Sequence, residues 1–112
     1  FKYNKNFQIN GNGLQSRDYI YVKDVVRLLV ESLEKLKKNN IYHFSSNQNI
    51  KIIDIVKIIK NKFNYKKKIS YSKKRLGDIY YHKLDNRKLK KIADFKLTSF
   101  SKGIDETIKY YW

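Results

Sequence analysis

Two stretches of this sequence repeat apolar side chains at helical spacing, which limits the chain to folds that bury two helical faces. In residues 25–36, one face carries Val25, Leu28, Leu29, Ser32, Leu33 and Leu36. In residues 52–63, one face carries Ile52, Ile55, Val56, Ile59 and Phe63. A helix that is apolar on one side is stable in water only when that side packs on another element. The spacing therefore predicts two amphipathic helices in a folded domain.

Short segments with strand character alternate with these helices. The predicted strands are residues 7–9, 19–22, 41–46 and 66–72, the second and third rich in β-branched and aromatic side chains. The expected helix caps are Asp24 for the first long helix, Asp85 for a short helix and Ser101 for a terminal helix. This alternation predicts an α/β fold with about four helices and three to four short strands. At 112 residues, the chain is one domain or part of one.

The chain carries a large excess of positive charge. Its 26 Lys and Arg against 10 Asp and Glu give a net charge of +16. Nearly all of the excess is lysine, and it accompanies abundant Asn, Ile, Tyr and Phe, as codon bias in an AT-rich genome produces. A domain selected to bind nucleic acid relies more on arginine, whose planar fork binds phosphates and guanines. The charge is therefore interpreted mainly as composition bias, which disfavours nucleic acid as a partner.

Several kinds of site are not expected. Without cysteine, the chain has neither disulfides nor a cysteine zinc site, which fits a cytoplasmic protein. No apolar run approaches the roughly 20 residues of a membrane span. His43 and His82 are far apart in the sequence, so no metal site is predicted. The sequence shows neither a GxGxxG loop nor a complete set of catalytic residues.

Arginine is rare here, so its positions are informative. The four arginines are Arg17, Arg27, Arg75 and Arg87. Arg17 directly precedes Asp18, and Arg75 lies three residues before Asp78, each in a segment with turn-forming residues. Retention of arginine in a lysine-rich chain indicates a need for its five-donor planar group. The alternative reading is that each arginine pairs with its neighbouring aspartate and braces its own loop.

These residues form a set of motifs in a fixed order. "GNGLQSRDYIYVKD", from Gly11 to Asp24, "IYHFSSNQNIKIIDIVKII" and "RLGDIYYHKLDNRKLKKIADFKLTSFSKGIDETIKYYW" follow one another over most of the chain. Together they resemble the C-terminal third of NAD-dependent sugar-nucleotide epimerases and dehydratases, the extended short-chain dehydrogenase/reductase family. The resemblance implies that residues 1–112 are the C-terminal substrate-binding region of an extended Rossmann-type fold.

The resemblance also implies roles for individual residues. Arg17 and Arg75 would bind the diphosphate of a nucleotide sugar, and Asp78 would accept hydrogen bonds from the ribose hydroxyls. Tyr81 and His82 are secondary candidates, because many relatives have a histidine three residues after this aspartate. The chain departs from the family at "FSSNQN", where relatives carry a glycine-containing loop, and at Leu76, where proline is common.

The residues that do chemistry in this family belong to its N-terminal NAD-binding Rossmann domain, which the resemblance places outside this sequence. NAD, a nucleotide sugar and that domain are accordingly the implied cofactor, substrate and partner, and full-length members can form homodimers. No catalytic residue is predicted here, and the chain by itself is expected to be inactive. Two alternatives stay open. One is a small basic nucleic-acid-binding module using Lys66–Lys68, Lys73–Arg75 and the Tyr80–Tyr81 pair. The other is a truncated gene product with a structural role.

Overall fold

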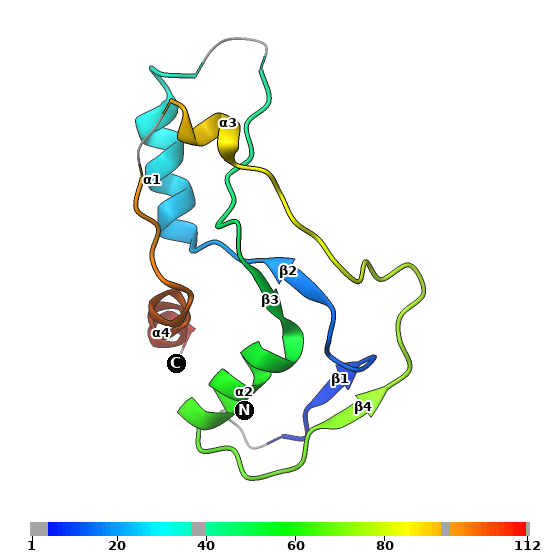
Figure 1. Cartoon of the computed structure of the whole chain (residues 1–112). Helices are drawn as coiled ribbons and strands as arrows, with labels where there is room; N and C mark the ends of the chain where they lie inside the picture. The colour runs from blue at the N-terminus through cyan, green and yellow to red at the C-terminus, as the bar shows by residue number, and fades with distance from the viewer. Residues whose placement is uncertain (1–4, 37–39, 93–94, 112) are drawn as a thin grey trace. The chain divides into compact units, whose positions relative to one another are not determined.

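Figure 1 traces the computed structural model, which describes residues 5–36, 40–92 and 95–111. Within these ranges, the helices are α1 (Val22–Ser32), α2 (Ile52–Lys62), α3 (Arg87–Lys90) and α4 (Phe100–Tyr111). The strands are β1 (Gln8–Asn10), β2 (Ser16–Asp18), β3 (Asn49–Lys51) and β4 (Ser70–Ser72). Helices and short strands alternate, so the predicted α/β fold class is confirmed.

The chain divides into two compact units, each built from two separate segments. The first unit contains Phe1–Arg17 and Asn49–His82, and the second contains Asp18–Gln48 and Lys83–Trp112. Each half of the sequence thus contributes to both units. Residues that lie far apart in sequence are brought together within a unit.

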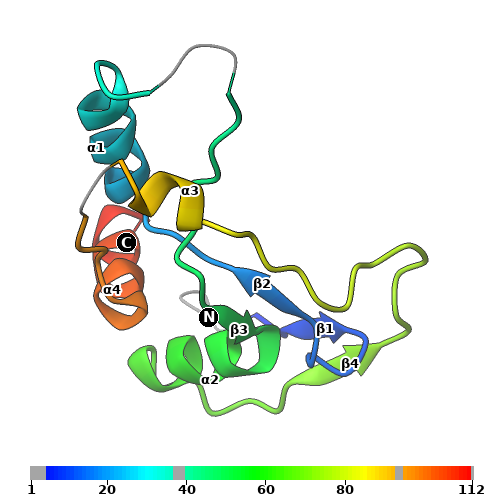
Figure 2. The same cartoon turned by 45° about the horizontal axis from the view of Figure 1, so that its top comes forward.

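In the first unit, β1 pairs with β4 in parallel, as Figure 2 shows. The register places Ile9 opposite Tyr71 and Asn10 opposite Ser72. β2 and β3 form a second two-stranded sheet. Ile9, Val56 of α2 and Tyr65 are each less than 5% exposed and form the apolar core of this unit. Parallel pairing needs a crossover between the strands, and the segment that includes α2 supplies it.

A glycine-rich turn after β1 holds the start of α2. Gly11 and Gly13 have φ angles of +74° and +75°, which residues other than glycine rarely adopt. The Gly13 carbonyl accepts a hydrogen bond from Ile53 N at 2.9 Å, and the Gln15 carbonyl accepts one from Ile52 N at 3.1 Å. These two bonds satisfy backbone N–H groups in the first turn of α2, which lack partners inside the helix.

The second unit contains α1, α3 and α4. Leu28 of α1 and Leu89 of α3 are at most 1% exposed and form its core. The Asp24 carboxylate accepts hydrogen bonds from Thr98 N at 2.7 Å and from Thr98 Oγ1 at 3.1 Å. Gly103 lies against the Tyr21 side chain, where an added Cβ would be 3.4 Å from Tyr21 Cβ. Asp24 thus ties the segment before α4 to α1, and Gly103 lets α4 itself pack closely against Tyr21.

Two predicted strands were wrong. Residues 19–21 have no strand pairing, and Val22 already begins α1. Residues 41–46 are irregular, with Ile41 78% exposed, and the strand of this region is β3 at Asn49–Lys51. β-forming side chains do not make a strand without a neighbouring strand to take up the backbone hydrogen bonds. The predicted strands at 7–9 and 66–72 correspond to β1 and β4, each shifted or shortened.

The three predicted caps were also wrong. Asp24 lies inside the first turn of α1, whose N-cap is Tyr21. Ser101 lies inside α4, where Ser99 Oγ instead accepts a hydrogen bond from Lys102 N at 3.4 Å. The N-cap of α3 is Asn86 and not Asp85, although the Asp85 carboxylate accepts a hydrogen bond from the backbone N–H of Arg87, the first residue of α3, at 2.9 Å. In the described residues, no helix is long and apolar enough to cross a membrane.

Candidate functional site

The "RLGD" segment forms a tight turn in the first unit. Asp78 N donates a hydrogen bond to the Arg75 carbonyl at 3.3 Å, and Gly77 has a φ of +77°. A positive φ at the third position is what a type II turn requires, and glycine supplies it without a steric penalty. Arg75 and Asp78 therefore begin at the two ends of one turn. Leu76, between them, is fully exposed.

Asp78 pairs with Arg17 from β2. Arg17 Nη2 donates a hydrogen bond to Asp78 Oδ1 at 2.6 Å, and Arg17 Nη1 donates one to the Ser16 carbonyl at 2.8 Å. The two side chains are 30% and 21% exposed. Charge-assisted bonds of this length are strong where water is partly excluded. Two of the three predicted site residues thus lie in direct contact.

The backbone beyond the turn explains this contact. Ser16 N donates a hydrogen bond to the Tyr80 carbonyl at 2.9 Å, and Ser16 and Tyr81 form an isolated parallel bridge. The segment after Asp78 therefore runs alongside β2. This pairing brings the Asp78 carboxylate within reach of the Arg17 side chain.

Arg75, the third predicted residue, docks on Asn10 at the end of β1. The Asn10 amide can be placed in two orientations, and only one matches donors to acceptors. In that orientation, the amide oxygen accepts hydrogen bonds from Arg75 Nε and Nη2, each at 3.0 Å, and the amide nitrogen donates to Ser72 Oγ at 2.8 Å. Asn10 was not singled out in the sequence, because an isolated asparagine near glycines indicates only a turn.

The alternative reading, in which each arginine braces its own loop, does not describe these contacts. Arg17 pairs with Asp78 and not with the adjacent Asp18. Arg75 contacts Asn10 through its guanidinium. Both arginines therefore join segments that are distant in sequence. Among the described hydrogen bonds of this pair, none uses Asp78 Oδ2 or Arg17 Nε.

The two secondary candidates are less constrained. The Tyr81 side chain is 61% exposed, and Tyr81 takes part in the site through its backbone bridge to Ser16. His82 is also exposed. The structure thus places both beside β2 without fixing their side chains. Among described residues, no group of three or more His, Asp or Glu side chains is arranged to hold a metal ion.

In the second unit, Asp18 anchors the loop that departs from the glycine-containing pattern. Its Oδ1 accepts hydrogen bonds from Ser46 N at 2.9 Å and Ser46 Oγ at 2.7 Å, and its Oδ2 accepts one from Ser45 Oγ. Asn47 takes a φ of 58°, a conformation that asparagine tolerates better than most residues. The loop therefore forms a left-handed turn without glycine, and Asp18 holds another segment, not its own loop.

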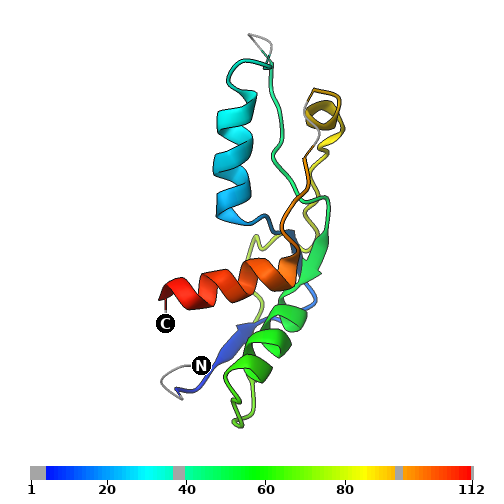
Figure 3. The ribbon, with the colours of Figure 1, turned by 90° about the vertical axis from the view of Figure 1, so that its left-hand side faces the viewer.

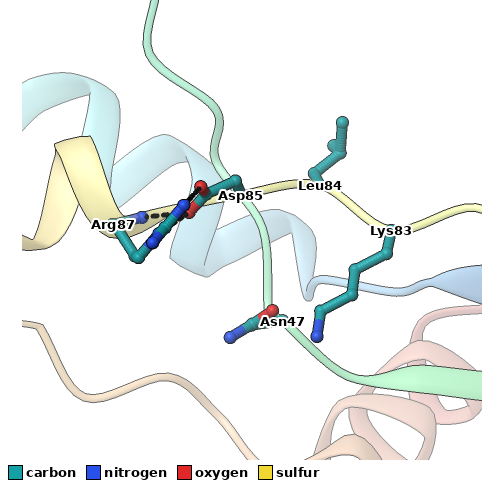
Figure 4. Close-up of a pocket in the computed structure, with 5 residues that line it drawn as sticks. All are labelled: Asn47, Lys83, Leu84, Asp85 and Arg87. Carbon is teal, nitrogen blue, oxygen red and sulfur yellow. Dashed lines mark hydrogen bonds and ion pairs between the residues drawn. The ribbon is translucent and has the colours of Figure 1, made fainter.

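The second unit also has an open depression of about 380 Å³, lined by Asn47, Lys83, Leu84, Asp85 and Arg87 (Figure 4). Arg87 Nε lies 3.0 Å from Asp85 Oδ1 and 2.8 Å from Oδ2, and Arg87 Nη2 lies 2.6 Å from Oδ2. Hydrogen bonds from the Arg87 side chain lower the pKa of Asp85 from 3.8 to about 2. Asp85 and Arg87 thus pair with each other here, and none of the predicted site residues lines this depression.

Known proteins resemble this chain in sequence and in fold. The pattern of the NAD dependent epimerase/dehydratase family matches residues 1–45. The chain superposes on UDP-glucose 4-epimerase from Thermotoga maritima, solved with UDP-glucose, with a TM-score of 0.90 at 28% identity, over 97% of this chain and 35% of that one. The chain thus resembles the NAD-dependent epimerase/dehydratase family in sequence and in fold. The resemblance inferred from the sequence is thereby confirmed.

Two further members of this family show its range of reactions. UDP-N-acetylglucosamine 4-epimerase from Methanobrevibacter ruminantium, solved with UDP-N-acetylmuramic acid, matches with a TM-score of 0.87 at 29% identity, over 97% of this chain and 35% of that one. The dTDP-glucose 4,6-dehydratase 1 of Escherichia coli strain K12 is 28% identical, over 96% of this chain and 32% of that protein. The chain spans about a third or less of the length of the relatives that it matches.

Proposed function

We propose that this chain is the nucleotide-sugar-binding part of an NAD-dependent sugar-nucleotide 4-epimerase or 4,6-dehydratase. The observation that carries the proposal is the contact between Arg17 and Asp78, at the same turn that bears Arg75. Two guanidinium groups near one turn suit a diphosphate, because each can donate two N–H groups to phosphate oxygens. A carboxylate oxygen beside them suits the hydroxyl groups of a ribose.

Such a site would bind the substrate at a distance from the reacting sugar carbon. Binding energy from the nucleotide then holds the sugar in place for hydride transfer and lowers the entropic barrier. NAD would supply the redox chemistry, and the residues that hold NAD would belong to a dinucleotide-binding domain of the same protein. On this proposal, residues 1–112 are the substrate-binding region and are inactive without that domain.

Helix α1 supports the need for such a partner domain. Its residues Val22, Val26, Leu29 and Val30, and Leu33 at its C-cap, are between 48% and 78% exposed. They recur at intervals of three and four residues and so form one apolar stripe along the helix, whose course Figure 3 shows. The match covers 35% of each of these two solved neighbours, so their chains extend beyond the region that resembles this one. We assign this α1 stripe to packing against the dinucleotide-binding domain.

Nucleotide binding tests the first part of the proposal. The protein to use is the product of the whole reading frame that contains this sequence, called the complete polypeptide below. Arg75→Ala should weaken the binding of UDP or TDP, measured by calorimetry, at least tenfold, which is about 1.4 kcal/mol. Arg87→Ala is the matched control, because the exposed Arg87 side chain is paired with Asp85 in the second unit. Equal affinities of wild type and Arg75→Ala would overturn the site assignment.

Thermal unfolding tests the second part. In the complete polypeptide, Val30→Asp places a charge under the partner domain and should lower the Tm by several degrees, because burying an unpaired charge is costly. Glu31→Asp, one residue along, introduces aspartate off the stripe at a position that already carries a carboxylate, paired with Arg27 at 3.5 Å. If the two variants unfold at the same temperature, the α1 stripe does not face a buried interface.

A further inference from the structure

We propose that Asn10 is a positioning residue that holds the Arg75 guanidinium for a nucleoside diphosphate. The inference rests on the proposed function and adds a residue to its site. Its basis is the forked contact in which one Asn10 oxygen accepts from both Arg75 Nε and Arg75 Nη2, at 3.0 Å each. Arg75 itself lies on an exposed turn, so without this contact its long side chain would sample many rotamers.

Asn10 is well fixed for this role. Its backbone lies opposite Ser72 in the β1–β4 register, and its carbonyl accepts a hydrogen bond from Gln15 Nε2 at 2.9 Å. Its amide nitrogen donates to Ser72 Oγ at 2.8 Å, which sets the orientation of the amide. The oxygen is thereby directed at Arg75. The β1 backbone and the Ser72 hydroxyl of β4 together fix the position of the Asn10 amide oxygen.

The geometry leaves the opposite edge of the guanidinium available. The contact uses Nε and one hydrogen of Nη2, so Nη1 and the second hydrogen of Nη2 point away from Asn10. These are the N–H groups that form a two-pronged bond to a phosphate. A side chain held in this way loses less entropy when it binds, which is the general advantage of preorganisation.

The chemistry of the acceptor matters as well. An amide oxygen is neutral, so it orients Arg75 and leaves the positive charge of Arg75 uncompensated. Arg17 differs, because its partner Asp78 is ionisable and carries the opposite charge when deprotonated. Of the two arginines, Arg75 is therefore the one whose full charge is directed at an incoming diphosphate. An aspartate at position 10 would keep the geometry and cancel that charge.

The test is a double-mutant cycle on UDP affinity in the complete polypeptide. Asn10→Ala should weaken UDP binding about threefold to tenfold, the value of one oriented hydrogen-bond partner. In the Arg75→Ala background, the same change should have almost no effect. Asn10→Asp should weaken binding more than Asn10→Ala, because it neutralises Arg75. Asn12→Ala is the control, since Asn12 lies in the adjacent turn and bonds only to Leu14 N within the described residues.

A second readout does not depend on nucleotide binding. In the free protein, the Arg75 Nε–H signal in a ¹⁵N spectrum should exchange with water faster in Asn10→Ala than in wild type. If Asn10→Ala weakens UDP binding equally with and without Arg75, Asn10 acts only through the β1–β4 register, and the inference is wrong. If Arg75→Ala itself leaves UDP affinity unchanged, the proposed function fails and this inference fails with it.

Discussion

Arg17 Nη2 donates a hydrogen bond to Asp78 Oδ1 over 2.6 Å, although 61 residues of chain separate the two. The contact links β2 to the turn that carries Arg75, and both partners lie in the first unit. Their side chains are about one quarter exposed, so water screens the pair only in part. A structural contact and a proposed ligand site thus share the same two residues.

Removing the charge of Asp78 should therefore affect stability as well as binding. We expect Asp78→Asn to lower the free energy of unfolding by about 1–2 kcal/mol, the value of a partly buried hydrogen bond to a charged group. Urea denaturation followed by circular dichroism measures this. Asp54→Asn is the control, because Asp54 and Lys57 form an exposed pair at 3.6 Å. Equal losses in the two variants would contradict the importance of the Arg17 contact.

Asp18 should contribute more than Asp78 to stability. Its carboxylate accepts three hydrogen bonds from Ser45 and Ser46. We expect Asp18→Ala to cost about 3 kcal/mol, because buried donors lose their charged acceptor. Ser46→Ala removes one side-chain donor to that carboxylate and should cost about 1 kcal/mol. The same denaturation experiment ranks the two variants, and the reverse order would refute the assignment of Asp18 as the anchor of this loop.

Alanine substitutions at Gly13 and Gly77 distinguish the cost of backbone strain from the cost of a steric contact. Gly13 and Gly77 have nearly the same φ, +75° and +77°, so alanine at either site costs about 1–2 kcal/mol of strain. At Gly13, an added Cβ would also lie 3.2 Å from Ile53 Cβ, whereas at Gly77 no atom lies within 4 Å. We therefore expect Gly13→Ala to lower the Tm more than Gly77→Ala. Equal shifts would show that Ile53 moves aside without cost.

The pair of Asp85 and Arg87 predicts a pH effect at the start of α3. Hydrogen bonds from Arg87 lower the pKa of Asp85 from 3.8 to about 2. Because this pKa is lower in the folded state, the pair stabilises the fold above pH 3.8 and this stabilisation is lost as the pH falls through about 2. An NMR titration of the Asp85 carboxyl carbon should have its midpoint near 2. In Arg87→Ala the midpoint should return toward the ordinary value, and an unchanged midpoint would contradict the cause.

The basic surface should bind nucleic acid only weakly. Lys74 Nζ lies 5.7 Å from the centre of the Tyr80 ring, so a protein cation already occupies a position where a base could stack. We expect single-stranded RNA to bind without submicromolar affinity, measured by fluorescence anisotropy at two salt concentrations. Submicromolar binding with a steep salt dependence would instead support the nucleic-acid module considered from the sequence.

Local patterns in the sequence were sufficient for the long helices and for the turn. The apolar spacing of residues 52–63 predicted α2 almost to its ends, because an amphipathic helix depends on residues three and four positions apart. The order of the R-D and R-x-G-D motifs indicated the family. Arg17 and Arg75 could also be selected, because arginine is conspicuous in a lysine-rich chain, whereas Asp78 was selected through the family resemblance.

Only the tertiary structure decided how these residues meet. The strand expected at 41–46 did not form, because strand formation depends on a hydrogen-bonding neighbour that local sequence does not specify. Likewise, the partner of Asp78 is Arg17, since the segment after the turn runs along β2, and the partner of Arg75 is Asn10, since β1 and β4 end side by side. Residue types and local periodicity are properties of the chain alone. Which side chain lies within 3 Å of another depends on strand register, which is set by contacts across the whole unit.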